Sequence, residues 1–319
     1  MSILSSGWRW KPWSQLIPYA RSRKATSRRI AISTIMLYYK VIMLPVLLDL
    51  KFIKIYTYGI FLVLGFFWST FILWRNIRLT SYKEEEVFDG LFLSIASGLF
   101  FGRLVYVVLN FDKFGFDFFK FILVNGYPGF SIWGVLFGLF LSLYLFFSSK
   151  KVNFFAAIDY FMTPLFIAAV FGKLGSFFSG AEVGEKTNFI LKTKYLGFDG
   201  FRHLTPLYEG LVFIAIAFLA QKVLLEIRKE KYFPGFLFYL SLWYFSLTYF
   251  VFDKIKANHL YFQGYSFNRV VSAILLLTIT VYFIYYFRSS VIEFLKKYGQ
   301  KINKKIHLGA KGKTGERKK

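Results

Sequence analysis

Residues 156–184 read AAIDYFMTPLFIAAVFGKLGSFFSGAEVG, an apolar run that ends in a lysine, glycines, serines and a glutamate. The apolar part has roughly the 20 residues that a helix needs to cross a bilayer. A charged side chain at membrane depth costs about 3 kcal/mol or more, so we expect Lys173 to face the bundle interior or a wet cavity. Glycines let a backbone or a ligand approach closely. The stretch predicts a membrane helix that ends in an anion site, with helix packing by the glycines as the alternative.

The rest of the chain has the same character, since 56% of its 319 residues are hydrophobic and 23% are aromatic. A soluble domain cannot bury that much apolar surface. Alternating polar and apolar positions are missing, which argues against a membrane barrel. The sequence therefore predicts an all-α, polytopic membrane helix bundle with seven transmembrane helices. Their expected ranges are 57–74, 89–109, 129–149, 156–178, 204–226, 234–252 and 269–287.

Basic residues indicate the orientation of these spans. The loops after the first, third and fifth spans, together with the C-terminal tail, carry more than twice as many lysines and arginines as the other loops. Because cytoplasmic flanks accumulate these residues, the C-terminus is expected in the cytoplasm. The net charge of +24 lies in such flanks and in the tail. It predicts attraction to anionic membrane lipids rather than to nucleic acid.

The N-terminal region differs from the spans in composition, because it is rich in basic residues. We expect a basic extension over 1–50, a membrane domain over 51–288 and a basic tail over 289–319. Seven spans with the C-terminus inside would leave the basic N-terminus outside. Residues 29–48 forming an eighth helix would resolve this, as would a natural start at Met36 or Met43, and an interfacial helix is a third reading.

Six segments along these spans also carry a resemblance. In order they are YTYGIFLVLGF (56–66), FFGRLVYVVLNF (100–111), PGFSIWGVLFG (128–138), GKLGSFFSGAEVG (172–184), RHLTPLYEG (202–210) and YSFNRVVS (265–272). Together they resemble the prolipoprotein diacylglyceryl transferases, bacterial membrane enzymes. The resemblance implies transfer of a diacylglyceryl group from phosphatidylglycerol to the lipobox cysteine of prelipoproteins, the first step of lipoprotein maturation, at the inner membrane.

Several polar positions of that family are substituted in this chain. The signature arginine is Lys173, and the signature asparagines are serines. The signature glutamate aligns with Ala181, one residue before Glu182. A histidine of the third span is Trp133, and an arginine of the sixth span is Phe245. These departures motivate a second hypothesis, a relative that binds phospholipid or lipoprotein without transfer. An unrelated transporter is a weaker third hypothesis, because the halves of the chain show no convincing repeat.

The implied reaction needs a cation for the phosphate and a group that helps the thiol ionise. Lys173 supplies a point charge and Arg103 a planar fork. The three histidines lie outside the predicted spans, so Glu209 and Asp159 are the candidate catalytic groups. The candidate substrate-binding residues are Lys173, Arg103, Gly172, Gly175, Ser176, Tyr58 and Arg202. No motif indicates a metal or a cofactor, and the absence of cysteine means that any thiol comes with the substrate.

These residues also have structural interpretations. Arg103 and Asp159 could pair between helices. Glu209 could brace the start of its span, and His203 could be an ordinary loop residue. The region 180–202 is expected to be an external loop, either a connector or a receiver of the prelipoprotein.

Overall fold

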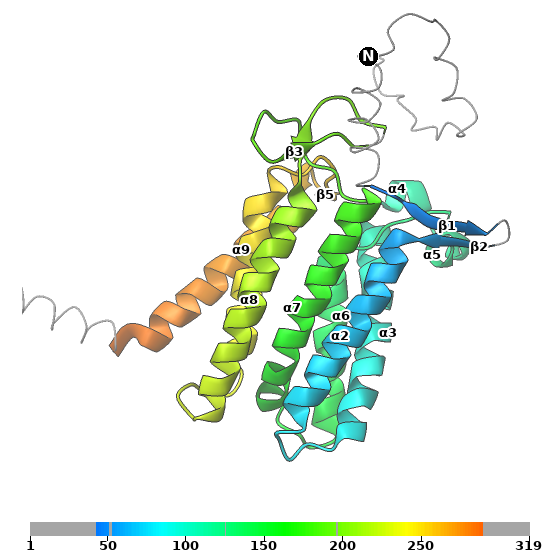
Figure 1. Ribbon diagram of the computed structural model, residues 1–319. Coiled ribbons are helices and arrows are strands. Elements are labelled where there is room, and N and C mark those ends of the chain that lie inside the picture. The colour runs from blue at the N-terminus through cyan, green and yellow to red at the C-terminus, as the bar shows by residue number, and fades with distance from the viewer. Residues whose placement is uncertain (1–42, 51–52, 125, 196, 290–319) are drawn as a thin grey trace, which may run out of the picture. The chain divides into compact units, whose positions relative to one another are not determined.

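The computed structural model describes residues 43–50, 53–124, 126–195 and 197–289. Within these ranges the chain forms long helices and three two-stranded antiparallel sheets (Figure 1). The strands are β1 (Val46–Leu50), β2 (Ile53–Tyr56), β3 (Lys192–Thr193), β4 (Arg202–His203), β5 (Tyr261–Phe262) and β6 (Tyr265–Ser266). The helices are α2 (Thr57–Ile77), α3 (Glu84–Leu109), α4 (Phe111–Phe114), α5 (Phe118–Ile122), α6 (Ile132–Ser149), α7 (Phe154–Ser179), α8 (Thr205–Arg228), α9 (Phe236–Asp253) and a final helix, Phe267–Ser289.

Seven of the helices in the described part are long and apolar enough to cross a membrane, which confirms the predicted bundle. The observed bounds lie within five residues of the expected ones. The largest difference is at α3, which begins at Glu84 instead of residue 89. Its first turn holds three glutamates, and carboxylates are favourable there because they face the positive end of the helix dipole. An apolar run cannot reveal such a turn.

The segment 29–48, for which an eighth helix was one of the alternatives, lies mostly outside the described residues. Its last residues are described, and they are not helical, because Val46–Leu50 pairs with Ile53–Tyr56 as an antiparallel hairpin. The β-branched residues Val46, Ile53 and Ile55 suit extended backbone. Residues 46–48 are therefore extended and not helical.

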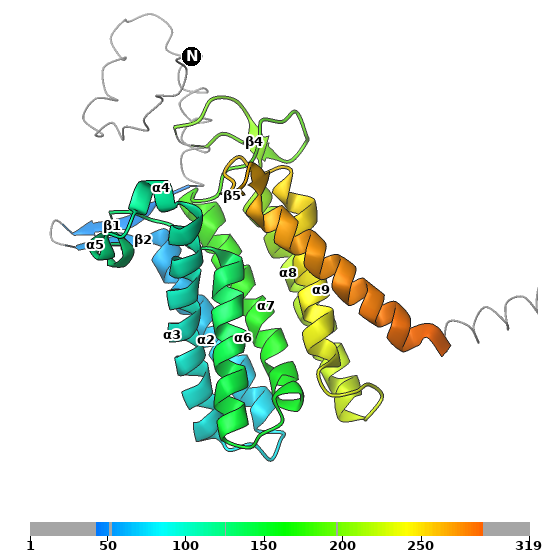
Figure 2. The same ribbon diagram turned by 180° about the vertical axis from the view of Figure 1, so that it is seen from behind.

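Glycines bring α3 and α6 into close contact, side by side in Figure 2. A Cβ at Gly134 would lie 2.6 Å from the carbonyl oxygen of Phe101, and a Cβ at Gly138 would lie 2.6 Å from that of Ser97. Small residues four apart allow backbones to approach in this way in membranes. The other extensive helix contacts join α2 with α7 and α7 with α8, so α7 lies at the centre of the packing.

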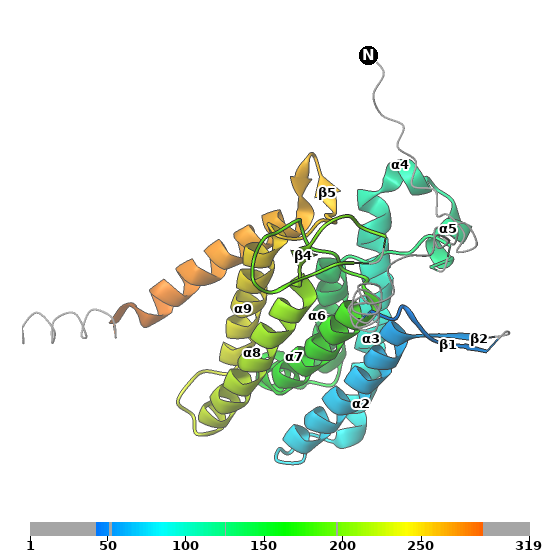
Figure 3. The ribbon, with the colours of Figure 1, turned by 45° about the horizontal axis from the view of Figure 1, so that its top comes forward.

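The hairpins and the short helices gather at one end of the bundle, where α7 ends and α8 begins (Figures 1 and 3). We call it the hairpin end. The connections Arg78–Lys83, Lys150–Asn153 and Lys229–Gly235 lie at the opposite end, because successive spans alternate in direction. The final helix starts at the hairpin end and runs obliquely away from the other helices (Figures 1 and 2).

Candidate functional site

Two helices bring oppositely charged side chains together at the hairpin end. Lys173 lies in the last two turns of α7, and Glu209 lies in the second turn of α8. The Nζ atom of Lys173 is 2.6 Å from Oε2 of Glu209. Glu209 is fully buried and Lys173 is 7% exposed. Each charge is stabilised by the other in a place where either one alone would be costly.

Two loop residues complete this group. Lys256, 8% exposed, places its Nζ 2.6 Å from Oε1 of Glu209, so each oxygen of Glu209 meets one lysine. Glu182 accepts hydrogen bonds from Lys173 at 2.7 and 2.8 Å and lies 3.7 Å from Lys256. We call Lys173, Glu182, Glu209 and Lys256 the charge cluster. It contains two positive and two negative groups.

Backbone pairing holds the two loops of the charge cluster together. The N–H of Glu185 donates to the carbonyl of Ile255 at 2.8 Å, and the N–H of Ala257 donates to that of Val183 at 2.9 Å. Gly184 lies within this pairing, and a Cβ there would lie 2.4 Å from the carbonyl oxygen of His203. Only glycine fits that approach. The pairing therefore fixes Glu182 and Lys256 on opposite sides of one backbone bridge.

Aromatic and hydroxyl side chains surround the amines. The ring centroid of the buried Tyr249 on α9 is 5.3 Å from Nζ of Lys173 and 4.5 Å from Nζ of Lys256. A ring face this close to a cation is attractive. Ser176, one turn after Lys173, donates from Oγ to Glu182 at 3.3 Å. The amines are thus held by carboxylates on one side and by a ring on another.

Glu182 differs from Glu209 in accessibility, because about a third of its side chain is exposed. Burial opposes its charge, but Lys173 and Lys256 outweigh this effect and lower the pKa of its carboxyl to about 2. It is therefore ionised at neutral pH. A partly exposed carboxylate on two lysines occupies the position that an entering anion, such as a phosphate, would take.

Arg103 does not join the charge cluster. All three kinds of guanidinium nitrogen donate to backbone carbonyls, those of Phe121, Gly129 and Lys120, at 2.8 to 2.9 Å. The ring of Phe114 lies 5.1 Å from its Cζ. A buried guanidinium needs acceptors, and the chain after α3 supplies them. Arg103 thus fastens the α4–α5 segment to α3, with three of its five N–H donors bonded to backbone carbonyls.

Asp159 also lies elsewhere. Its two oxygens accept hydrogen bonds from the N–H groups of Gly235 and Phe238 at 2.7 and 2.8 Å, at the start of α9. The site is at the opposite end, 14 residues or about 21 Å along α7 from Lys173. The ion pair with Arg103 is absent, since both residues have other partners. Asp159 caps α9 and does not approach the charge cluster.

The other predicted binding residues divide into two groups. Ser176 touches the charge cluster, and Tyr58 packs beside Gly175, where a Cβ would lie 3.1 Å from the Tyr58 ring and 2.8 Å from Cβ of Phe61. Gly175 therefore serves the α2–α7 packing, whereas a Cβ at Gly172 would meet nothing within 4 Å. Arg202 donates to the carbonyl of Gly184 at 3.0 Å and so holds the loop.

The two aromatic substitutions lie against each other. The rings of Trp133 on α6 and Phe245 on α9 are 5.8 Å apart at their centroids, and Trp133 is 5.9 Å from Tyr249. Both residues belong to the apolar core. The two residues that we aligned with polar positions of the family therefore lie at one place in the bundle, where their rings pack together.

Sequence reasoning missed Lys256 and Tyr249. Lys256 follows a span end, where a lysine is normally explained by the interface. A count of charges could have predicted Lys256. Lys173 alone balances only one of the two carboxylates, Glu182 and Glu209, so a second cation is required nearby. From the sequence, Glu182 was identified only as the residue after Ala181, the position aligned with the family's glutamate. In the structure Glu182 is the residue that contacts Lys173.

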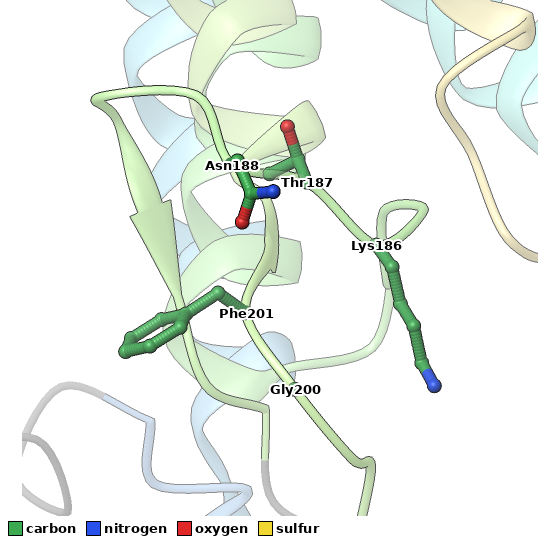
Figure 4. A pocket seen from close by; sticks show the side chains of 5 residues that line it. All are labelled: Lys186, Thr187, Asn188, Gly200 and Phe201. Carbon is green, nitrogen blue, oxygen red and sulfur yellow. The ribbon is translucent and has the colours of Figure 1, made fainter.

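A shallow hollow in the connection between α7 and α8 is lined by Lys186, Thr187, Asn188, Gly200 and Phe201. In Figure 4 the amine of Lys186 and the ring of Phe201 point to different sides, and no set of polar groups converges. This hollow does not resemble a catalytic site, so the charge cluster remains the candidate.

Fold and site together define a polytopic helical membrane protein with a buried ion cluster at one end. The sequence model of the prolipoprotein diacylglyceryl transferase family matches residues 45–285, and the chain belongs to this family of transferases. It is 24% identical over 241 residues to the phosphatidylglycerol–prolipoprotein diacylglyceryl transferase of Clostridium novyi, covering 73% of this chain and 92% of that protein. The same-named protein of Clostridioides difficile is 27% identical over 223 residues, 70% and 87% of the two chains. That of Clostridium tetani is 28% identical over 145 residues, 46% and 57%.

Proposed function

We propose that this chain transfers a diacylglyceryl group from phosphatidylglycerol to the lipobox cysteine thiol of prelipoproteins. The observation that carries the proposal is the pair of buried lysines at the hairpin end. Family membership and the names of the relatives support the same reaction.

Lys173 and Lys256 would bind the phosphate of the lipid. Their amines approach the same two carboxylates, so both can reach one anion. Glu182 is the ligand to be displaced, because its side chain is partly exposed, whereas Glu209 is fully buried and keeps the amines in place. In the reaction the thiol sulfur bonds to the glyceryl carbon, the carbon–oxygen bond to phosphate breaks, and its electron pair leaves with glycerol phosphate. Two cations stabilise that charge.

The distribution of basic residues over the loops and the tail favours an orientation with the hairpin end on the outer face of the bacterial inner membrane and the C-terminus in the cytoplasm. Prelipoproteins, whose signal peptides cross the membrane, would present the cysteine at that outer face. The exposed residues Phe189, Ile190 and Leu191 in the connection after α7 lie at the same end and suit contact with lipid or signal peptide.

Complementation tests the proposal. The full chain, a Met43 start and Lys173→Ala are expressed in a bacterium depleted of its own transferase, and prelipoprotein modification is followed by gel shift. Rescue by the wild type, with loss in Lys173→Ala, is the expected result. Absence of rescue by both starts, despite membrane expression and a matching lipid and prelipoprotein, would overturn it.

The packed rings of Trp133 and Phe245 favour a second candidate, a relative that binds phospholipid or lipoprotein without transfer. Phosphatidylglycerol vesicles that bind the purified protein through Lys173, with no diacylglyceryl product from a lipobox peptide, would support this alternative. Product formation would exclude it.

A further inference from the structure

The proposed reaction releases a proton from the thiol, and the charge cluster offers no free base for it. Both oxygens of Glu209 lie 2.6 Å from a lysine amine. Glu182 is held in its ionised form by the same lysines, and its low pKa makes it a weak proton acceptor. The acceptor must come from outside the cluster.

His259 lies close to the charge cluster along the chain. It follows Lys256 by three residues, so about 11 Å is the greatest separation of their Cα atoms. The backbone bridge from Ala257 to Val183, described above, keeps this segment against the loop of Glu182. His259 is partly exposed, which leaves it accessible from the hairpin end.

A carboxylate lies beside this histidine. Asp253, 2% exposed, ends α9 one turn after Tyr249, and its Oδ1 lies 3.4 Å from Nδ1 of His259. Among the described residues, His259 is the basic side chain within salt-bridge distance of this buried carboxylate. Because Asp253 lies on the Nδ1 side of the ring, Nε2 is the nitrogen left for a substrate.

We infer that His259, beside Asp253, is the general base that takes the proton of the attacking thiol; this inference rests on the proposed function. Nε2 gains the proton while sulfur bonds to the glyceryl carbon, and the electron pair of the broken carbon–oxygen bond leaves with glycerol phosphate. The thiol's own ionisation, with a pKa near about 8.5, is helped by this transfer at neutral pH.

The other histidine in the described part provides a matched control. His203 lies in β4 at the same end, with its ring 6.1 Å from Phe189 and 6.2 Å from Tyr208. No carboxylate lies within salt-bridge distance of it among the residues that the structure describes. The side chains next to His259 are Asp253 on α9 and Tyr261 on β5, whose ring centroid is 5.8 Å from that of His259. The nearby Lys256 is paired with Glu209 and Glu182.

The test measures kcat and KM of the purified full chain with phosphatidylglycerol and a cysteine-containing lipobox peptide, from pH 6 to about pH 9.5. His259→Ala should lower kcat at pH 7 by about 100-fold or more with little change in KM. Added imidazole should restore part of the rate, and the deficit should shrink at high pH, where the thiol ionises unaided. Asp253→Asn should reduce kcat less, and His203→Gln should leave it unchanged.

His259→Gln, which keeps polarity and size, checks folding through its thermal midpoint. A wild-type kcat in His259→Ala or His259→Gln would overturn the inference, as would a deficit equal at pH 7 and at high pH. In either case the proposed function survives. If the wild type itself transfers nothing, the proposed function fails and the inference fails with it.

Discussion

Asp159 and Glu209 are both fully buried carboxylates at helix ends, but they lie at opposite ends of the bundle and are stabilised in different ways. Asp159 accepts hydrogen bonds from peptide N–H groups of α9. Glu209 meets the amines of two lysines. The first arrangement is complete within the fold. The second gathers two cations beside a partly exposed carboxylate, which the incoming phosphate displaces in the proposed function.

The difference teaches that burial of a carboxylate in a membrane bundle does not by itself indicate chemistry. What distinguishes the two is the partner. Peptide donors are fixed by the backbone and bind nothing else, whereas lysine amines can exchange one anion for another. Four changes test whether this distinction holds, from the largest expected effect to the smallest.

Lys173→Ala removes one of the two cations from the charge cluster. We expect transfer to fall by about 100-fold or more, because one of the two groups that stabilise the leaving phosphate is lost. Product formation per folded molecule measures it. Lys222→Ala, at an exposed position of α8, is the control and should match the wild type. Equal rates for Lys173→Ala and the control would remove the distinction between the two ends.

Glu209→Gln keeps the shape of the side chain but leaves two lysines with one carboxylate. The free energy of unfolding should fall by about 3 to 5 kcal/mol, because a buried ion pair is broken from one side. Transfer should fall as well, since the amines lose their common anchor. Thermal unfolding and transfer are measured on the same preparation. A variant as stable as the wild type would contradict the role of Glu209 as anchor.

Asp159→Asn makes the matched change at the opposite end. The amide keeps one acceptor oxygen, so we expect a loss of about 1 to 3 kcal/mol in stability and no change in transfer per folded molecule. Transfer assayed below the thermal midpoint separates the two effects. A large loss of rate in a folded Asp159→Asn protein would return Asp159 to the catalytic candidates.

The pH dependence of stability gives the smallest effect. The pKa of Glu182 is lowered to about 2, so its contribution is present above the usual carboxyl pKa of about 4.3 and is lost as the pH falls toward 2. The contribution of Glu182 to the thermal midpoint should therefore be present and constant between about pH 5 and pH 8. Glu182→Gln should lose less stability than the wild type on acidification below this range. Equal acid sensitivity of both proteins would show that Glu182 is not held by the lysines.

Much of the fold follows from the sequence. A helix that crosses a bilayer needs about 20 mostly apolar residues, and these appear in the sequence as continuous runs. The position of Glu209 beside Lys173 could have been predicted from the sequence, since both residues lie near span ends that are expected on the same face of the membrane. The roles of Arg103 and Asp159 could not have been predicted. Their partners are backbone groups of distant segments, and a sequence does not show which carbonyl or N–H will lie near a given side chain. Lys256 was hidden for the same reason, because only the pairing of two loops brings it to Glu209.

The final helix, Phe267–Ser289, has 23 residues and is little buried by its neighbours. It extends about 35 Å, a few ångströms more than a typical hydrocarbon core. Its contacts with α9 are made by side chains such as Trp243, which donates to Thr280 at 2.9 Å. A loosely held helix of excess length adjusts to membrane thickness by changing its tilt. We therefore expect a change in bilayer thickness to alter the tilt of this helix while α7, enclosed by α2 and α8, keeps Lys173 at a constant depth.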